Sequence, residues 1–244
     1  MSVGLARIEW LVPSLLAALA WLLYVWRRCG QPPPSPRRVA AAFALGALSP
    51  LGVFGVHALL QRGELPFVSS LTVAGSAVGR LAYFTVVVGF VEEAVLLAAV
   101  LGSLLGRCSL QRPVHGAVLS SAAALGFAAV ENARYAGALG TDVLVGRAVL
   151  STLGHLLISM VWGLALGMRC SRRAGGWGGV GTALALAAVL HGVYDTFLYD
   201  GHVWPAVAML AALWPLLAVA AGEAGIPEAK ADTGAGAPAA GREA

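Results

Sequence analysis

Long apolar segments, separated by short polar connections, make up most of this chain. A helix that crosses the hydrocarbon core of a bilayer needs about 20 mostly apolar residues, and seven segments come close to or exceed that length. The pattern therefore predicts an all-α, polytopic transmembrane helix bundle of about seven spans. The expected spans are residues 8–26, 39–60, 81–105, 114–136, 147–168, 177–198 and 204–221.

The start of the chain allows two interpretations. "SLLAALA" contains the small residues typical of a signal-peptide cleavage site. The apolar run nevertheless continues through "WLLYVW" to Arg27 and Arg28, so we expect an uncleaved first span. The next connection, "CGQPPPSPRR", contains four prolines and is expected to be extended. Residues 61–80 are ambiguous and are interpreted as a re-entrant or interfacial piece.

Two parts of the chain differ in composition. We expect residues 1–222 to form one integral membrane bundle. Residues 223–244 are rich in Ala, Gly and Pro without apolar periodicity, which predicts a disordered cytoplasmic tail.

Composition supports a membrane location and bears on the binding partners. Hydrophobic residues make up 59% of the chain and charged residues 11%, whereas soluble domains carry about 25% charged residues. Lys230 is the only lysine, so the net charge of +4 comes from arginines clustered in short loops. This pattern orients a protein in a bilayer and gives no support to nucleic-acid binding.

Arginine placement predicts the orientation. Alternate connections place nine arginines on one side, which is then expected to be cytoplasmic, with the amino terminus outside and the tail inside. These are Arg27, Arg28, Arg37, Arg38, Arg107, Arg112, Arg169, Arg172 and Arg173. Cys29, Cys108 and Cys170 adjoin these clusters, so they are expected to be free thiols on the reducing side, without a catalytic role.

Titratable residues recur at membrane depth in four successive spans. Charged groups there cost about 2.5–3.5 kcal/mol on insertion scales, and they usually face the bundle interior or a wet cavity. The spacing of His191 and Asp195 places both on one helix face. The candidates are Glu92 and Glu93, then Glu131 and Asn132, then His155, then His191 and Asp195. We expect this cluster to meet around one pocket, whereas a lone His155 or Asn132 would more often be a packing residue.

The residue types allow more than one chemistry. Two histidines with a carboxylate, such as His155, His191 and Glu92, can hold a divalent metal such as zinc. The same groups can also hydrolyse without a metal, with a desolvated glutamate as the general base that activates water. No HExxH motif, phosphate-binding loop or serine-nucleophile turn occurs in the sequence.

Four motifs in this order resemble the PrsW family of intramembrane proteases, which is distantly similar to the CAAX-protease and bacteriocin-processing group. They are "EEAVL", "FAAVEN", "GHLLISMVWG" and "HGVYD", over about residues 80–200. The resemblance implies that Glu92 and Glu93 are paired catalytic carboxylates. It also assigns the family's Glu-Asn motif to Glu131 and Asn132, its two histidines to His155 and His191, and its acidic residue to Asp195.

The resemblance implies a peptidase that cleaves a membrane-anchored protein, and its best-known member acts on an anti-sigma factor. We therefore expect Glu92 or Glu93 to activate water and His155 and His191 to polarise the carbonyl or bind a metal. Asp195 would orient His191, while Glu131 and Asn132 would position water or substrate.

One position departs from the family pattern. Leu96 stands where a lysine usually follows the second glutamate by three residues. Arg134, one turn from Glu131, is a candidate replacement for that cation. Two other functions stay open: a proton- or cation-coupled transporter, and a catalytically inactive scaffold, which the Leu96 departure favours.

Overall fold

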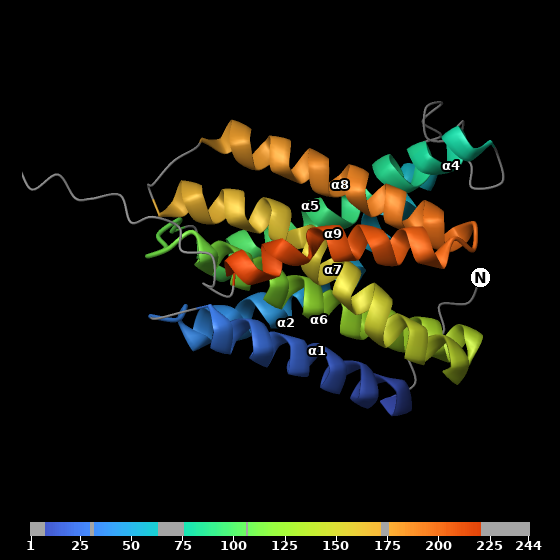
Figure 1. Ribbon diagram of the computed structural model, residues 1–244, viewed down its shortest axis with the longest axis horizontal. Coiled ribbons are helices and arrows are strands. Elements are labelled where there is room, and N and C mark those ends of the chain that lie inside the picture. The colour runs from blue at the N-terminus through green and yellow to red at the C-terminus, as the bar shows by residue number, and fades with distance from the viewer. Residues whose placement is uncertain (1–7, 30–31, 63–75, 106, 172–175, 221–244) are drawn as a thin grey trace, which may run out of the picture.

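Among the described residues, eight α-helices and one π-helix form one bundle (Figure 1). The structure, a computed structural model, describes residues 8–29, 32–62, 76–105, 107–171 and 176–220. The described part is all helical outside its connections, as the hydropathy pattern predicted. The elements are α1 (Ile8–Arg28), α2 (Pro36–Arg62), α4 (Ala77–Tyr83), the π-helix η1 (Phe84–Gly89), α5 (Phe90–Ser103), α6 (Val114–Leu139), α7 (Thr141–Cys170), α8 (Trp177–Tyr199) and α9 (Val203–Ala220).

The predicted spans agree with these helices. Six of the described segments are long and apolar enough to cross a membrane, with α4, η1 and α5 together forming the third (Ala77–Ser103). The seventh predicted span corresponds to α9, of which Val203–Leu216 counts as a shorter apolar helix. Pro32–Ser35 is non-helical, as the prolines predicted. Residues 63–75 and the predicted tail at 223–244 lie outside the described residues.

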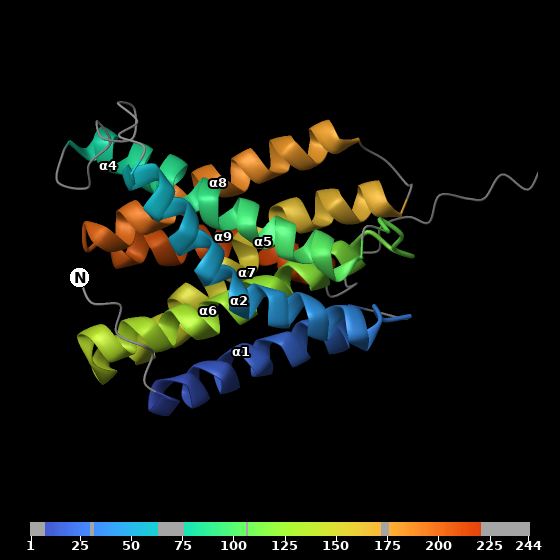
Figure 2. The ribbon, with the colours of Figure 1, turned by 180° about the vertical axis from the view of Figure 1, so that it is seen from behind.

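Helix α6 forms the centre of the bundle. It packs against α7, α2 and α1, and α1 and α8 lie at opposite edges of the molecule in both views (Figures 1 and 2). Small residues allow this close packing, because TM helices associate most closely where backbones can approach. A Cβ atom at Gly126 would overlap the carbonyl of Phe43 on α2, and one at Gly163 on α7 would overlap the Ser120 side chain. Burial of α6 therefore follows from its run of Ala, Gly and Ser.

The third span is interrupted by the π-helix η1. Its sequence, "FTVVVG", contains four consecutive β-branched residues, which crowd a regular α-helical turn. The Phe90 N–H bonds back to the Thr85 carbonyl, five residues earlier. The His57 Nε2 atom on α2 lies 2.8 Å from the Val87 carbonyl oxygen inside this segment. Such π-turns are frequent at functional sites, and this one lies directly before Glu92 and Glu93.

Two glycines bring this span against α8. A Cβ atom at Gly89 would lie 2.7 Å from the Ala188 carbonyl oxygen and 3.0 Å from His191 Cβ. A Cβ atom at Gly192 would overlap Thr85 in η1. Because both positions lack a side chain, the backbone before Glu92 can approach the turn of α8 that carries His191.

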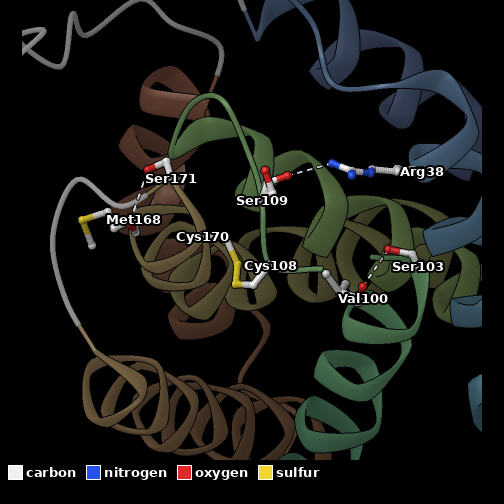
Figure 3. Close-up of a disulfide and its surroundings, with 8 residues drawn as sticks. All are labelled: Arg38, Val100, Ser103, Cys108, Ser109, Met168, Cys170 and Ser171. Carbon is white, nitrogen blue, oxygen red and sulfur yellow. Dashed lines mark hydrogen bonds between the residues drawn. A yellow bond between two sulfur atoms is a disulfide. The ribbon is translucent and has the colours of Figure 1, made fainter. Parts of the chain in front are cut away.

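The cysteines differ from the sequence prediction. Cys108 and Cys170 form a disulfide that joins the connection after α5 to the end of α7 (Figure 3), so the prediction of free thiols is wrong for this pair. The prediction rested on compartment alone, and spacing in the sequence does not reveal that residues 62 positions apart have Cα atoms 4.7 Å apart. Cys29 is buried and lies outside this disulfide, with its Sγ 3.0 Å from the Trp26 carbonyl oxygen. Burial raises the pKa of its thiol, although the charge of Arg112 opposes the shift.

We predict that Gly192→Ala destabilises the protein while Gly181→Ala, on the same helix, does not. The added methyl group must displace Thr85 at position 192, and overpacking typically costs about 1–3 kcal/mol. Nothing lies within 4 Å of a Cβ at Gly181, where replacing a mid-helix glycine normally gains about 0.5–1 kcal/mol. Thermal unfolding in detergent measures both. Equal melting temperatures for the two variants would contradict the proposed close approach of η1 to α8.

Candidate active site

A cavity of 670 Å³ lies among α2, η1, α5, α6, α7 and α8. Five of the seven candidate residues from the sequence line it: Glu92, Glu131, His155, His191 and Asp195. The other two, Glu93 and Asn132, lie outside the cavity lining and contact residues that belong to it. The structure thus gathers titratable groups from four helices around one space.

Glu93 is fully buried behind the cavity and accepts three hydrogen bonds. Its Oε2 atom accepts from Ser159 Oγ and from the Trp162 indole N–H, each at 2.7 Å. Its Oε1 atom lies 3.0 Å from His191 Nδ1. An indole N–H can only donate, so these partners fix Glu93 as an acceptor and direct its other oxygen toward His191.

Glu92 has a different environment from its neighbour. Its Oε2 atom is buried, has no hydrogen-bond partner among the described residues, and lies 3.5 Å from His191 Nε2. The carboxylate lines the cavity. Because adjacent helical residues point about 100° apart, one glutamate reaches the cavity while the other lies between α5, α7 and α8.

Glu131 contacts one nitrogen of His155, as Glu93 contacts one nitrogen of His191. Its Oε2 atom lies 3.1 Å from His155 Nε2 and accepts a 2.6 Å bond from Arg147 Nη2. Arg147 also donates to Ser151 Oγ and, through Nε, to Asn132 Oδ1. The Asn132 amide in turn donates to Thr152 Oγ1. Asn132 therefore contacts the start of α7 and not the cavity, in contrast to the role expected for it.

The two imidazoles each keep one nitrogen available. His191 Nδ1 and His155 Nε2 face carboxylates, which favours a proton on those atoms and a lone pair on the opposite nitrogens. His155 Nδ1 is buried without a hydrogen-bond partner among the described residues. The two rings meet edge to face, with centroids 5.1 Å apart.

Glu92, His155 and His191 fit a divalent metal. Glu92, His155 and His191 each offer a ligand atom, and the three atoms lie within 4.8 Å of one another. Two histidines with one carboxylate form a common ligand set of catalytic zinc, which leaves a coordination position for water. Carboxylates that fix the other nitrogen of each ligating histidine are the usual outer partners of such sites, and Glu93 and Glu131 are placed in that way.

Asp195 lies further from His191 than expected. Its Oδ2 atom is 3.7 Å from His191 Nε2, beyond hydrogen-bonding distance. Glu93, at 3.0 Å from Nδ1, is therefore the group that orients His191. Asp195 is about one quarter exposed and lines the cavity, which leaves its carboxylate accessible from that space.

Several residues of the site were not predicted. Arg147, and not Arg134, contacts Glu131, while the Arg134 guanidinium lies over the rings of Phe54 and Tyr135. Leu96, at the position of the family lysine, is fully buried in the apolar core. The Ser159 and Trp162 contacts had a signal in the sequence, since positions 155, 159 and 162 share one helix face. Tyr194, whose buried hydroxyl lines the cavity without a hydrogen-bond partner among the described residues, also had a signal, since it lies within the "HGVYD" motif three residues after His191.

The fold and site together define an all-helical membrane protein with a buried histidine and carboxylate centre that fits a divalent metal. A family model described as "PrsW family intramembrane metalloprotease" matches residues 34–220. The chain belongs to this family, which confirms the resemblance seen in its motifs.

Two curated relatives carry the name Protease PrsW. The protein of Geobacillus kaustophilus (strain HTA426) is 34% identical over 112 residues, which cover 43% of this chain and 48% of the relative. The protein of Shouchella clausii (strain KSM-K16) is 31% identical over 134 residues, which cover 54% of this chain and 62% of the relative. The matches thus extend over about half to three fifths of these relatives. No solved structure matches the chain.

We predict that Arg147→Leu destabilises the protein and that adding Glu131→Gln restores part of the loss. Removing one member of a buried ion pair leaves the other charge uncompensated, at a cost of about 3–5 kcal/mol. The two side chains here are 21% and 12% exposed, so the low end of that range applies. Arg134→Leu serves as the matched control, because Arg134 stacks on rings. Thermal unfolding in detergent measures the stability of each variant. An equal loss of stability in Arg147→Leu and Arg134→Leu would contradict the pairing of Arg147 with Glu131.

Proposed function

We infer that this chain is a metal-dependent intramembrane peptidase that hydrolyses a peptide bond of a membrane-anchored protein. One observation carries the inference: Glu92, His155 and His191 converge with available ligand atoms, while Glu93 and Glu131 hold the remaining imidazole nitrogens. Family membership supports the same class of reaction. A structural role alone would not require unpartnered polar atoms inside a lipid-embedded bundle, where each one is costly.

Glu92 Oε2, His155 Nδ1 and His191 Nε2 would hold the metal. When bound, a metal of this kind polarises a carbonyl oxygen and lowers the pKa of water. Zinc fits the two-histidine, one-carboxylate donor set. Glu93 and Glu131 keep the protons on His191 Nδ1 and His155 Nε2, so that the lone pairs face the cavity.

Asp195 is the general base and acid of the reaction. Its carboxylate takes a proton from the attacking water as the water oxygen bonds to the scissile carbonyl carbon. It then returns that proton to the leaving nitrogen as the carbon–nitrogen bond breaks. This assignment replaces Glu92 or Glu93 as the base, because Glu93 accepts three hydrogen bonds and Glu92 belongs to the ligand set.

Tyr194 stabilises the oxyanion that forms on the carbonyl oxygen. Its hydroxyl is a buried donor at the cavity wall with no competing partner among the described residues. A preorganised donor in a water-poor site contributes more to the transition state than the same donor in water.

The substrate is a membrane-anchored polypeptide that enters the cavity in an extended form. The wall combines the polar cluster with apolar side chains, among them Val53, Phe54 and Ile158. A peptide bond can react only if its backbone groups leave the helical hydrogen-bond ladder, and in lipid that is tolerated in a polar cavity within protein. Cleavage of an anti-sigma factor is the specific form suggested by the family resemblance alone.

We predict that Glu92→Gln abolishes both cleavage of a single-span reporter and binding of one divalent metal per chain. Asp142→Asn, an exposed carboxylate at the start of α7, is the matched control and keeps both. The readouts are reporter proteolysis in proteoliposomes and metal content after dialysis against zinc. Cleavage by wild-type protein that survives metal removal would contradict the metal-dependent mechanism and favour a glutamic-type one. Coupled ion flux without cleavage would favour a transporter.

We predict that Tyr194→Phe lowers kcat about 10²–10³-fold, the loss typical of removing one oxyanion donor. KM and metal content stay close to wild type, because the ring remains and the hydroxyl has no hydrogen-bond partner among the described residues. Steady-state cleavage kinetics measure both constants. A loss confined to KM, or an unchanged kcat, would remove Tyr194 from the reaction.

A further inference from the structure

A second cavity, of 720 Å³, lies at the opposite end of α2 from the site, between the start of α2 and the end of α5. Three arginines surround it: Arg37 and Arg38 in the first turn of α2, and Arg107 after α5. Its other walls are apolar or small, and none of the described carboxylates lines it. The remaining lining residues are Ala41, Ala44, Leu45, Gly102, Ser103, Leu104 and Leu105.

The positive charge at this cavity favours binding of an anion. A helix N-terminus carries partial positive charge and favours an anionic partner, yet the first turn of α2 contains two arginines and no acidic residue. Arg107, in the connection after α5, adds a third cation. A phosphate at this point would meet guanidinium groups that bind its oxygens in pairs.

The shape of the cavity suits a hydrocarbon chain below that anion. The small residues Ala41, Ala44 and Gly102 line the cavity between α2 and α5 together with Leu45, and a Cβ at Gly102 would lie 3.3 Å from Leu45 Cδ1. Leu105, at the rim, is 87% exposed and has a positive φ of 49°, an uncommon conformation for a side chain other than glycine. An exposed leucine side chain at this position is favoured where the surrounding medium is lipid.

One of the three arginines, Arg38, is held in place by a contact within the protein. Arg38 Nη1 donates a 2.8 Å hydrogen bond to the Ser109 carbonyl (Figure 3). The segment that carries Ser109 is held to α7 by the Cys108–Cys170 disulfide and by the Leu110 N–H, which bonds to the Cys170 carbonyl. Arg107 therefore belongs to a tethered loop, which lowers the entropic cost of ordering it around a headgroup.

We propose that this cavity binds an anionic glycerophospholipid, with the headgroup phosphate between Arg37, Arg38 and Arg107 and one acyl chain between α2 and α5. Basic pockets between transmembrane helices bind anionic headgroups in this manner. The site is separate from the histidine and carboxylate centre and does not depend on the proposed proteolysis.

The test compares phosphatidylglycerol with phosphatidylcholine of identical acyl chains, added to the purified full chain in detergent. Phosphatidylglycerol is expected to raise the melting temperature by about 5 °C at saturation and to remain bound in native mass spectrometry. Phosphatidylcholine or inorganic phosphate at the same concentration should do neither. Equal effects of the two lipids, or of phosphate alone, would overturn the proposal.

Matched variants distinguish binding at this cavity from attraction by the other arginines at the same end of the bundle. Arg37→Gln with Arg107→Gln should weaken phosphatidylglycerol binding about tenfold or more, since each basic residue near a headgroup contributes about that order of attraction. Arg27→Gln with Arg169→Gln removes the same charge outside the cavity and should leave binding unchanged. Ala44→Phe keeps every charge and fills the acyl groove, so it should also weaken binding. Equal weakening by both arginine pairs, or none by Ala44→Phe, would overturn the proposal.

Discussion

The buried carboxylate of Glu93 is the constraint on which the rest of the site depends. A carboxylate in the middle of a lipid-embedded bundle requires donors from within the protein, and α7 supplies two, Ser159 and Trp162, while α8 supplies His191. These bonds fix the rotation of α5 relative to both helices. They also place Glu92 toward the cavity and orient His191 with one nitrogen directed to the same space. The hydrogen bonds that compensate for the burial of Glu93 thus also position Glu92 and His191 in the centre.

A second carboxylate–histidine pair, Glu131 and His155, is arranged in the same way on α6 and α7. Arg147 holds Glu131, and Glu131 faces His155 as Glu93 faces His191. The two halves differ in the source of the donors: neutral side chains from α7 bond Glu93, whereas a guanidinium bonds Glu131. The cation that the family pattern led us to expect near the glutamate pair is absent, because Leu96 is part of the apolar core. Positive charge enters the site through α7 instead, beside Glu131. Small residues make this arrangement possible, since Gly89 and Gly192 let the third span and α8 come close enough for Glu93 to reach His191.

Much of this fold can be predicted from the sequence, because length and hydropathy alone define helices that cross a bilayer. The candidate residues could also be found, since titratable groups at membrane depth are rare. What could not be predicted is how the roles divide among them. Glu92 and Glu93 are adjacent in sequence and differ only in which helices they face, and Asp195 is one turn from His191 yet is not hydrogen-bonded to it. Arg147 could not be recognised as the partner of Glu131, because the two residues lie on different helices. The disulfide between Cys108 and Cys170 was missed for the same reason: contacts between distant segments leave no local pattern.

The central claim is that two carboxylate-held histidines and Glu92 form one metal centre inside the bundle. X-ray absorption at the metal edge of purified, zinc-loaded protein tests it most directly, because it reports the ligands without requiring a substrate. The account predicts one zinc per chain with two imidazole nitrogens and oxygen ligands at about 2.0–2.2 Å, and loss of one imidazole in each of His155→Ala and His191→Ala. Substoichiometric zinc, or a ligand sphere without imidazole, would contradict it.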